Sequence, residues 1–281
     1  MNRSRRAEIA EESVQILNTG GYISPSGREV SLRAELAAAV EGSRLYRPTD
    51  VQTELSLLAP AYPQPVVAVT GETTLEAAAR LVDEDGSDEL LCLNFASAKN
   101  PGGGFLSGSQ AQEESLARSS GLYACLIPHM AMYEHNRALS TALYSDHMIY
   151  SPGVPVFRDE GGQLLETPFQ VAFLSAPAVN AGAVRRNEPE RAARIESVMR
   201  TRLERVLWVA RQQGHRSLIL GAWGCGVFGN EPDVVARLFA EQLLGSGRFA
   251  GQFARLVFAV YDRSEGQAVL AAFRRELIPS P

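Results

Sequence analysis

Three consecutive glycines, Gly102-Gly103-Gly104, constrain this chain more than any other feature of its sequence. Each glycine loses much conformational entropy on ordering and brings no side chain to a core, so packing does not explain the run. Such a run is typical of backbone that passes very close to a ligand. Directly after it, Ser109 and Gln112 have the spacing of a capping box, which predicts the start of a helix. Glu113 and Glu114 would then lie in the first turns of that helix, beside the glycine loop.

A second glycine-rich segment, Gly221–Asn230, follows the apolar run 217–220. Its glycines leave backbone N–H groups free to point at a ligand, and the helix that follows adds partial positive charge at its N-terminus. Asn230 suits the N-cap of that helix, and Pro232 suits its first turn. The segment therefore predicts a phosphate or diphosphate site that needs no basic side chain. A purely structural turn is the weaker alternative, because four glycines fall within nine residues.

Gly224, Gly226 and Gly229 also match the dinucleotide fingerprint G-x-G-x-x-G, which by itself is a weak signal. In a nicotinamide dehydrogenase the fingerprint follows the first strand, and several strands come after it. Only about 50 residues follow it here, which leaves room for one more strand. The position of the fingerprint therefore disfavours a dehydrogenase and favours a diphosphate loop in another architecture.

The rest of the chain alternates short apolar runs with helical patterns, which predicts βα units and a largely parallel sheet of about six strands. Ligands of such sheets bind at the carboxyl ends of the strands, where both glycine loops fall. Residues 1–60 read as a mainly helical accessory segment packed on a core of residues 61–281. Strands are expected at 66–69, 90–95, 147–150, 169–175, 217–220 and 256–261. Helices are expected at 4–18, 32–40, 73–81, from the first glycine loop to 127, at 189–212, at 233–244, and up to 277.

Composition restricts the partners of the chain. A net charge of −5 provides no excess of lysine and arginine, so direct binding to nucleic acid or to an anionic membrane is not expected. The three cysteines are scattered, which suits a reducing compartment, and the N-terminus lacks the apolar segment of a signal peptide. A cytoplasmic protein is the expectation. The four histidines lack zinc-like spacing, so no metal site is predicted.

Gly102-Gly103-Gly104, seven further residues and then Gln112-Glu113-Glu114 resemble the signature of the poly(ADP-ribose) glycohydrolases. The surrounding 94–102 segment is similar to the microbial branch of that family, and Gly221–Asn230 is similar to its diphosphate loop. The resemblance extends from about residue 66 to the C-terminus. It implies a macrodomain-like core of three layers, α/β/α with a mixed sheet, and hydrolysis of the ribose–ribose bonds of poly(ADP-ribose). ADP-ribose, poly(ADP-ribose) and ADP-ribosylated proteins are the implied partners, in the DNA damage response, without metal or organic cofactor.

The resemblance also implies a role for each matching residue. Glu114 would be the catalytic acid/base, Glu113 would hydrogen-bond ribose hydroxyls, and Gln112 would help to order the loop. Asn100 and Phe228 would contact the terminal ribose, and the second glycine loop would line the diphosphate. The implied substrate-binding residues are Asn100, Gly102, Gly103, Gly104, Gln112, Gly224, Gly226, Val227, Phe228, Gly229 and, near the adenine, Tyr261.

Glycosidases usually use two separated carboxyl groups, whereas Glu113 and Glu114 point about 100° apart on a helix. We therefore expect Glu114 alone to protonate the departing ribose oxygen and then to activate a water. A helix N-terminus favours the ionised carboxylate by up to about 1 kcal/mol, although an acid at neutral pH needs a raised pKa. The charge of Glu113 and desolvation by the substrate would have to overcome that preference.

Several plainer interpretations compete with these. Glu113 and Glu114 could form a solvated helix face, which the preceding glycines disfavour. Cys225 is expected to be a small buried filler rather than a nucleophile. Glu72 is an alternative adenine contact. Arg185 could contact polymer phosphates, but a solvated loop is the stronger interpretation. Two further functions stay open, namely a non-catalytic ADP-ribose reader and a mono-ADP-ribosyl hydrolase, which share the fold. A reader has no use for a carboxyl group at the glycosidic bond.

Overall fold

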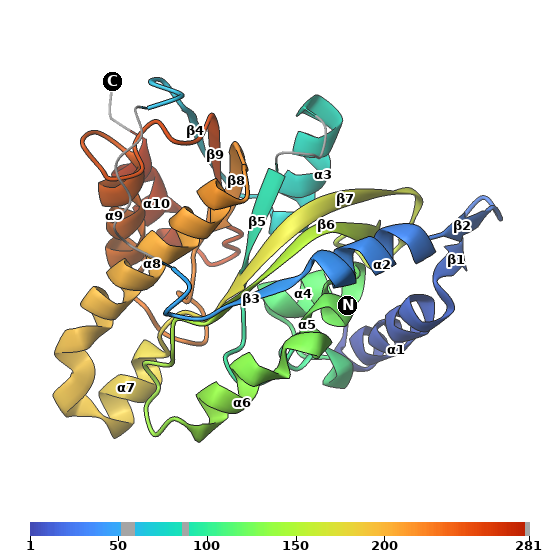
Figure 1. Cartoon of the computed structure of the whole chain (residues 1–281), viewed down its shortest axis with the longest axis horizontal. Coiled ribbons are helices and arrows are strands. Elements are labelled where there is room, and N and C mark those ends of the chain that lie inside the picture. Colours follow the sequence, from blue (N-terminus) through green and yellow to red (C-terminus); the bar gives the residue numbers. More distant parts are fainter. Residues whose placement is uncertain (52–59, 86–89, 279–281) are drawn as a thin grey trace.

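The computed structural model describes residues 1–51, 60–85 and 90–278 of the chain. Within them, seven strands form a mixed central sheet in the order β3-β6-β7-β5-β8-β9-β4, and helices cover both faces (Figure 1). This confirms the predicted three-layer α/β/α arrangement with a mixed sheet. The strands are β3 (Arg44–Tyr46), β4 (Val66–Thr70), β5 (Leu90–Phe95), β6 (Met148–Arg158), β7 (Leu164–Ala176), β8 (Ser217–Gly221) and β9 (Arg255–Ala259).

The strands from β7 to β4 run parallel, whereas β6 and β3 add antiparallel pairs at one side of the sheet. Both faces of the parallel part are buried: in β5, Leu91 and Leu93 enter one apolar cluster, and Leu90 and Cys92 enter the other. Because parallel strands end at one edge, β5 and β8 deliver both glycine loops to the same side of the sheet.

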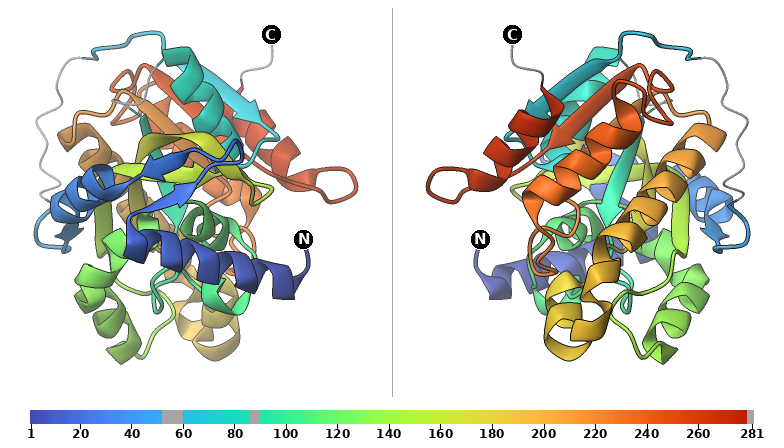
Figure 2. Two further views of the ribbon diagram at one scale, coloured as in Figure 1. Left: turned by 90° about the vertical axis from the view of Figure 1, so that its right-hand side faces the viewer. Right: turned by 90° about the vertical axis from the view of Figure 1, so that its left-hand side faces the viewer.

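Two groups of helices bury the two faces of the sheet (Figures 1 and 2). On one face lie α8 (Ile195–Gln212), α9 (Pro232–Leu243) and α10 (Ala268–Leu277). The other face is covered by α2 (Arg33–Gly42), α3 (Thr74–Asp85), α4 (Gln112–Ser119), α5 (Leu122–Leu126) and α6 (Met130–Ala138). Shorter elements are α7 (Ala181–Asn187) and the 3₁₀ turns η1 (Phe105–Ser107), η2 (Ile127–His129) and η3 (Pro189–Arg194). No helix of the described part of the chain is long and apolar enough to cross a membrane.

The N-terminal segment is the predicted, mainly helical extension. It contains α1 (Arg3–Thr19) and the antiparallel pair of β1 (Gly21–Ile23) with β2 (Glu29–Ser31), and it leads into α2 and β3. Figure 2 shows α1 running along one side of the molecule. Nε of Arg3 donates to the Ser107 carbonyl at 2.9 Å, and Nε of Arg6 donates to the Gly108 carbonyl at 2.7 Å. The extension thus contacts the outer end of the first glycine loop.

Some expected elements are wrong in extent. The residues between the strands expected at 147–150 and 169–175 form most of a long β6–β7 hairpin, although Pro152 and Pro155 lie within β6. A shift of register between Ser151 and Val154 accommodates Pro152, as is common for proline in sheets, whereas Pro155 lies opposite Gln170 in the ladder. The single helix expected up to residue 127 is broken, because the Gly121 N–H bonds to the Pro155 carbonyl at 2.9 Å between α4 and α5. The long helix begins at Ile195 rather than at 189, and β3, α6 and α7 were not predicted.

Candidate functional site

A cavity of about 630 Å³ opens at the carboxyl ends of the parallel strands, between the two glycine loops. This volume is typical of a site for a nucleotide-sized ligand. Of the predicted substrate-binding residues, Gly102 and Gly229 are not part of the cavity wall. The predicted residues that line it are Asn100, Gly103, Gly104, Gln112, Glu113, Glu114, Gly224, Gly226, Val227, Phe228 and Tyr261.

The first glycine loop is shaped around Glu114. The N–H of Gly104 donates to Oε1 of Glu114 at 3.0 Å. Gly103 has φ +61°, and a Cβ added there would lie 2.5 Å from Oε1 of Glu114 and 3.1 Å from Oε2 of Glu113. Only glycine combines this left-handed backbone with such a close approach. Gly102, with φ +69°, instead packs against the ring of Phe105. The loop therefore holds the Glu114 carboxyl group at the cavity wall.

The capping box predicted from Ser109 and Gln112 is wrong. Helix α4 has Ala111 at its N-cap and no side-chain cap. The Gln112 amide instead accepts the N–H of Phe95 at 2.8 Å and donates to the Leu93 carbonyl at 2.8 Å. Gln112 thus joins the start of α4 to the end of β5, because these tertiary partners replace the local ones. The second box that the sequence contains, Thr73 to Glu76, does form at the start of α3.

Glu113 is almost completely buried, although its side chain reaches the cavity wall. Its Oε2 accepts the N–H of Ser97 at 2.6 Å, and its Oε1 accepts Nδ2 of Asn94 at 3.4 Å. Burial raises the pKa of the Glu113 carboxyl to about 8, and the hydrogen bond from Ser97 offsets only part of that shift. Burial therefore disfavours ionisation of Glu113, while both of its oxygens accept N–H groups in the fold.

The second glycine loop is closed by Asn230, which the sequence assigned to the N-cap of the following helix. That assignment is wrong, because Glu231 is the N-cap of α9. The buried Asn230 amide donates to the carbonyls of Val179 at 2.8 Å and Gly224 at 3.1 Å. Pro232 does begin α9, as predicted. Asn230 thus links the C-terminal end of the loop to Gly224 near its start, which fixes the conformation of the loop.

The backbone of this loop is open to an anion. Within the described residues, the N–H groups of Gly224, Gly226, Val227 and Phe228 make no hydrogen bond. Val227 is 92 % exposed, so the tip of the loop is not covered by the protein. Such a row of unpaired N–H groups is an anion-binding arrangement. The geometry therefore supports the diphosphate site predicted from the glycine spacing.

Helix α7, which was not predicted from the sequence, hydrogen-bonds to the second glycine loop. The N–H of Gly182 donates to the Phe228 carbonyl at 2.9 Å, and Nη1 of Arg185 donates to the Gly229 carbonyl at 2.9 Å. Arg185 also pairs with Glu231 at 3.5 Å. Arg185 therefore stabilises the loop backbone, whereas the sequence placed it in a solvated loop.

The segment between α6 and β6 places another aromatic ring beside Phe228. The rings of Tyr144 and Phe228 lie 6.0 Å apart between centroids, at an interplanar angle of 49°. Tyr144 has φ +57°, a left-handed conformation that costs a bulky residue about 1–2 kcal/mol. Phe228 lines the cavity and Tyr144 does not. The Tyr144 ring therefore adjoins Phe228 without forming part of the cavity wall.

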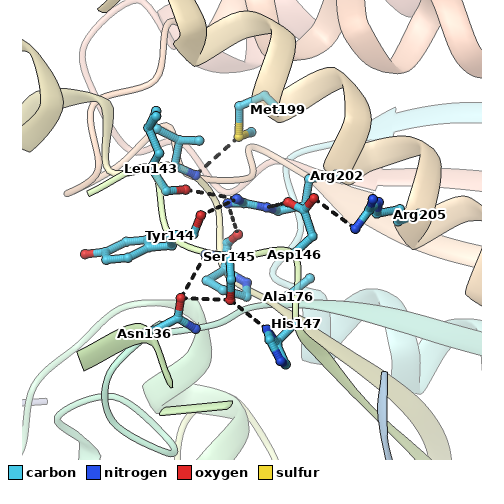
Figure 3. Close-up of polar contacts among 12 residues, drawn as sticks. Asn136, Leu143, Tyr144, Ser145, Asp146, His147, Ala176, Met199, Arg202 and Arg205 are labelled. Atoms are coloured by element: carbon cyan, nitrogen blue, oxygen red, sulfur yellow. Dashed lines mark hydrogen bonds and ion pairs between the residues drawn. The ribbon is translucent and has the colours of Figure 1, made fainter. Parts of the chain in front are cut away.

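A fully buried arginine holds this segment in place (Figure 3). Arg202 of α8 donates Nη2 to the carbonyls of Leu143 at 2.9 Å and Tyr144 at 3.3 Å, and Nε to Oδ1 of Asp146 at 2.8 Å. The Tyr144 ring points away from this network (Figure 3). On the α6 side, the N–H of Ser145 donates to Oδ1 of Asn136 at 2.8 Å. These contacts offset the strain at Tyr144.

Sequence reasoning missed several polar residues of the cavity wall. Glu160, in the turn between β6 and β7, accepts a hydrogen bond from Oγ of Ser115 at 3.1 Å, and burial raises the pKa of its carboxyl. Asp262 reaches the cavity after β9 and accepts the N–H of Val269 at 2.9 Å. No local motif marks either carboxylate. Ser97 could have been predicted from the sequence, because it lies between a buried strand and the glycine run.

Other candidates have structural roles. Glu72 forms two 2.8 Å hydrogen bonds with Arg80 and does not line the cavity, which argues against an adenine contact.

Cys225 is partly buried in the cavity wall, and burial raises the pKa of its thiol to about 12, which does not suit a nucleophile. Within the described part of the chain, no cluster of three or more His, Cys, Asp or Glu side chains could hold a metal ion.

Comparisons with known proteins identify relatives of this chain. A family model described as the microbial-type PARG catalytic domain matches residues 10–159. Poly(ADP-ribose) glycohydrolase (PARG) from Thermomonospora curvata is 51% identical, with 98% of this chain and 100% of that chain covered and a TM-score of 0.93. The structure of that glycohydrolase bound to the inhibitor ADP-HPD matches with a TM-score of 0.90 at the same identity and coverage. PARG from Deinococcus radiodurans in complex with ADP-ribose is 48% identical, with 86% of this chain and 97% of that chain covered and a TM-score of 0.80. No curated protein matches.

Proposed function

This chain belongs to the family of microbial-type poly(ADP-ribose) glycohydrolases, and on that basis we propose that it hydrolyses the ribose–ribose O-glycosidic bonds of poly(ADP-ribose) and releases ADP-ribose. One observation supports the chemistry above all others. The carboxyl group of Glu114 lies on the wall of a nucleotide-sized cavity, opposite a loop of unpaired N–H groups. An acid and an anion site facing one cavity are what cleavage of a sugar–diphosphate polymer requires.

In this proposal the second glycine loop holds the diphosphate of the terminal unit. Backbone N–H groups from Gly224 to Phe228 would donate to its oxygens, and the N-terminus of α9 would add partial positive charge. Phe228 and Asn100 would contact the terminal ribose, and Tyr261 would lie toward the adenine. Because both loops line one cavity, a diphosphate held by the second loop would place the anomeric carbon of the ribose near Glu114.

Glu114 would act alone as acid and base. It first donates its proton to the departing ribose oxygen while the bond from that oxygen to the anomeric carbon breaks. A water then adds to the anomeric carbon and returns a proton to Glu114. Glu113 does not suit a second catalytic carboxyl, because it is almost completely buried and its two oxygens already accept hydrogen bonds from Ser97 and Asn94. Its position at the cavity wall suits a hydrogen bond to a ribose hydroxyl.

We further propose that the enzyme acts in the cytoplasm on ADP-ribosylated proteins during the DNA damage response. The scattered cysteines, none of them in a disulfide among the described residues, suit a reducing compartment. Residues 1–60 would form an accessory segment packed on the catalytic unit 61–281, to whose central sheet they add the edge strand β3. The proposed boundary lies next to residues 52–59, which are outside the described part. Cell fractionation after DNA damage, together with measurement of polymer levels with and without the enzyme, tests these assignments.

The decisive experiment incubates the protein with poly(ADP-ribose) and separates the products by chromatography. Wild-type protein should release ADP-ribose, and Glu114→Gln should lower the rate by about 10³-fold while the Kd for ADP-ribose stays nearly unchanged. Glu134→Gln, an exposed glutamate of α6, serves as the matched control and should keep full activity. Turnover retained by Glu114→Gln would refute the assignment of the acid.

The same products separate the other functions of this fold. Binding of ADP-ribose without release would indicate a reader, and release only from mono-ADP-ribosylated protein would indicate a side-chain hydrolase. Monomer as the sole product indicates cleavage from chain ends, whereas short oligomers indicate internal cleavage.

A further inference from the structure

The polymer must leave the cavity at its ribose end. A cavity of about 630 Å³ holds one ADP-ribose, and the neighbouring unit is joined to the anomeric carbon that Glu114 serves. That unit therefore lies outside the cavity, next to Asn100 and Phe228 on the wall. Two side chains outside the cavity wall adjoin these residues: the Tyr144 ring lies 6.0 Å from that of Phe228, and the Lys99 ammonium group lies 6.0 Å from the Tyr144 centroid.

Resting on the proposed function, we propose that Lys99 and Tyr144 form a second binding site, which takes the ADP-ribose unit adjacent to the terminal one. The Tyr144 ring stacks on the adenine of that unit, and the Lys99 ammonium group pairs with its diphosphate. This site recognises the polymer rather than free ADP-ribose.

The arrangement of the rings suits a stacking surface. Tyr144 is only partly buried and lies beside Phe228, with ring centroids 6.0 Å apart. Nζ of Lys99 lies over the Tyr144 ring, 6.0 Å from its centroid. An aromatic face with a neighbouring cation is the usual composition of sites that bind a base and its phosphate. The two side chains therefore form one continuous surface outside the cavity.

The backbone at Tyr144 points to the same conclusion independently. A bulky residue at φ +57° is strained, and such strain persists where the surroundings impose it, often at ligand sites. Here the buried Arg202 binds the carbonyls of Leu143 and Tyr144 and the carboxylate of Asp146 (Figure 3). Glycine or asparagine would suit this backbone better. The ring at this position is not needed for the turn, so the strained tyrosine fits a role toward a ligand.

The charges near Tyr144 suit a diphosphate. Lys99 is the only lysine of the chain, in which the other 26 of 27 basic residues are arginines, and it is exposed. Arg137 lies close by, since its Nη2 is 3.4 Å from Oδ1 of Asn100. A chain with net charge −5 thus places two cations next to Asn100, a residue of the cavity wall. Each ADP-ribose unit of the polymer carries two phosphates, which these cations attract.

The test compares the polymer with free ADP-ribose. Tyr144→Asn removes the ring but keeps a residue that tolerates this backbone, and Tyr144→Phe keeps the ring. We expect Tyr144→Asn to lower kcat/KM for poly(ADP-ribose) about tenfold while the calorimetric Kd for ADP-ribose changes less than about twofold. Tyr144→Phe should behave like wild type. An equal loss of both quantities, or no loss in either, would overturn the proposal.

Lys99 offers a second readout. Lys99→Ala should lower kcat/KM for the polymer about threefold to tenfold at low salt and should reduce its dependence on salt, whereas Lys99→Arg should keep both. Because no other lysine is present, acetylation with an amine-reactive ester should reproduce the Lys99→Ala effect in wild type but not in Lys99→Arg. An unchanged salt dependence in Lys99→Ala would contradict the diphosphate contact.

The two proposals fail in different ways. A wild-type protein that releases no ADP-ribose from the polymer would overturn the proposed function and the second site together. A wild-type protein that cleaves the polymer, with variants of Tyr144 and Lys99 that cleave it equally well, would overturn the second site alone.

Discussion

The two glycine-rich loops face one cavity, but their glycines are required for different reasons. In the first loop, a Cβ at Gly103 would lie 2.5 Å from a carboxylate oxygen of Glu114, so the protein itself excludes a side chain. In the second loop, a Cβ at Gly226 would meet nothing within 4 Å, and Val227 beside it is almost fully exposed. The first loop is shaped around its own acid, whereas the open part of the second is free for a ligand.

The largest effect is expected at Gly103. Gly103→Ala should lower kcat about 10²-fold or more, because the added methyl group displaces the Glu114 carboxyl. Gly27→Ala is the matched control, since Gly27 also has a left-handed backbone, with φ +84°, but has open space around it. Steady-state kinetics on poly(ADP-ribose) with both variants checks this. Equal activity of the two variants would show that Glu114 does not depend on the shape of the loop.

The buried carboxyl of Glu113 should make stability depend on pH. Its pKa rises from 4.5 in the unfolded chain to about 8 in the fold, so folding favours the protonated form. The stability that the protonated Glu113 contributes is fully present below pH 4.5. Between pH 4.5 and about pH 8 the free energy of unfolding falls by about 1.4 kcal/mol per pH unit. Urea unfolding of wild type and Glu113→Gln at pH 5, 6, 7 and 8 measures the difference. Glu113→Gln should lose less stability than wild type over this range; parallel curves would place an ionised Glu113 in the fold.

A smaller effect is expected at Gly226, where the fold leaves room for a side chain. Gly226→Ala should weaken binding of ADP-ribose about tenfold, because the methyl group occupies space meant for the diphosphate, while Tm stays unchanged. Calorimetric titration and thermal unfolding separate the two effects. If binding is unchanged, the open space at this loop does not belong to the ligand.

The smallest expected effect is a difference in the free energy of unfolding between variants of the two capping-box sequences, Thr73–Glu76 and Ser109–Gln112. Thr73→Ala should lower the free energy of unfolding by about 1 kcal/mol, because the Thr73 hydroxyl accepts the N–H of Glu76 at 3.2 Å. Ser109→Ala should change it by no more than a few tenths, since α4 has no side-chain cap. Chemical unfolding of both variants is the measurement. A comparable loss at Ser109 would mean that its hydroxyl caps α4 in solution.

These two capping boxes also show what the sequence can predict. Thr73 and Glu76 satisfy each other within one turn, so local spacing is sufficient. At the first glycine loop, Gln112 has stronger partners in β5, which are 17 and 19 residues away in the chain. Likewise the buried strand 90–95 was readable from its apolar run. The full extent of β6 was not predicted, because Pro152 and Pro155 argue against a strand. The shift of register within β6 is defined only by its pairing with β7.

The site shows the same division. The carboxyl groups and glycines of the two loops were predictable, since their chemistry is unusual and contiguous in the chain. Glu160 and Tyr144 were not, because a hairpin turn brings Glu160 to the cavity and the contacts of Arg202 hold Tyr144 beside Phe228, both from distant segments of the chain. The pKa shift of Glu113 follows from burial, which no pattern of neighbouring residues reveals.

A crystal structure of the protein with ADP-ribose tests the central claim most directly. The diphosphate should accept hydrogen bonds from the N–H groups between Gly224 and Phe228, and the anomeric carbon should lie about 3–3.5 Å from an oxygen of Glu114 or of a water bound to it. A nucleotide bound outside this cavity, or one whose ribose lies away from Glu114, would contradict the account.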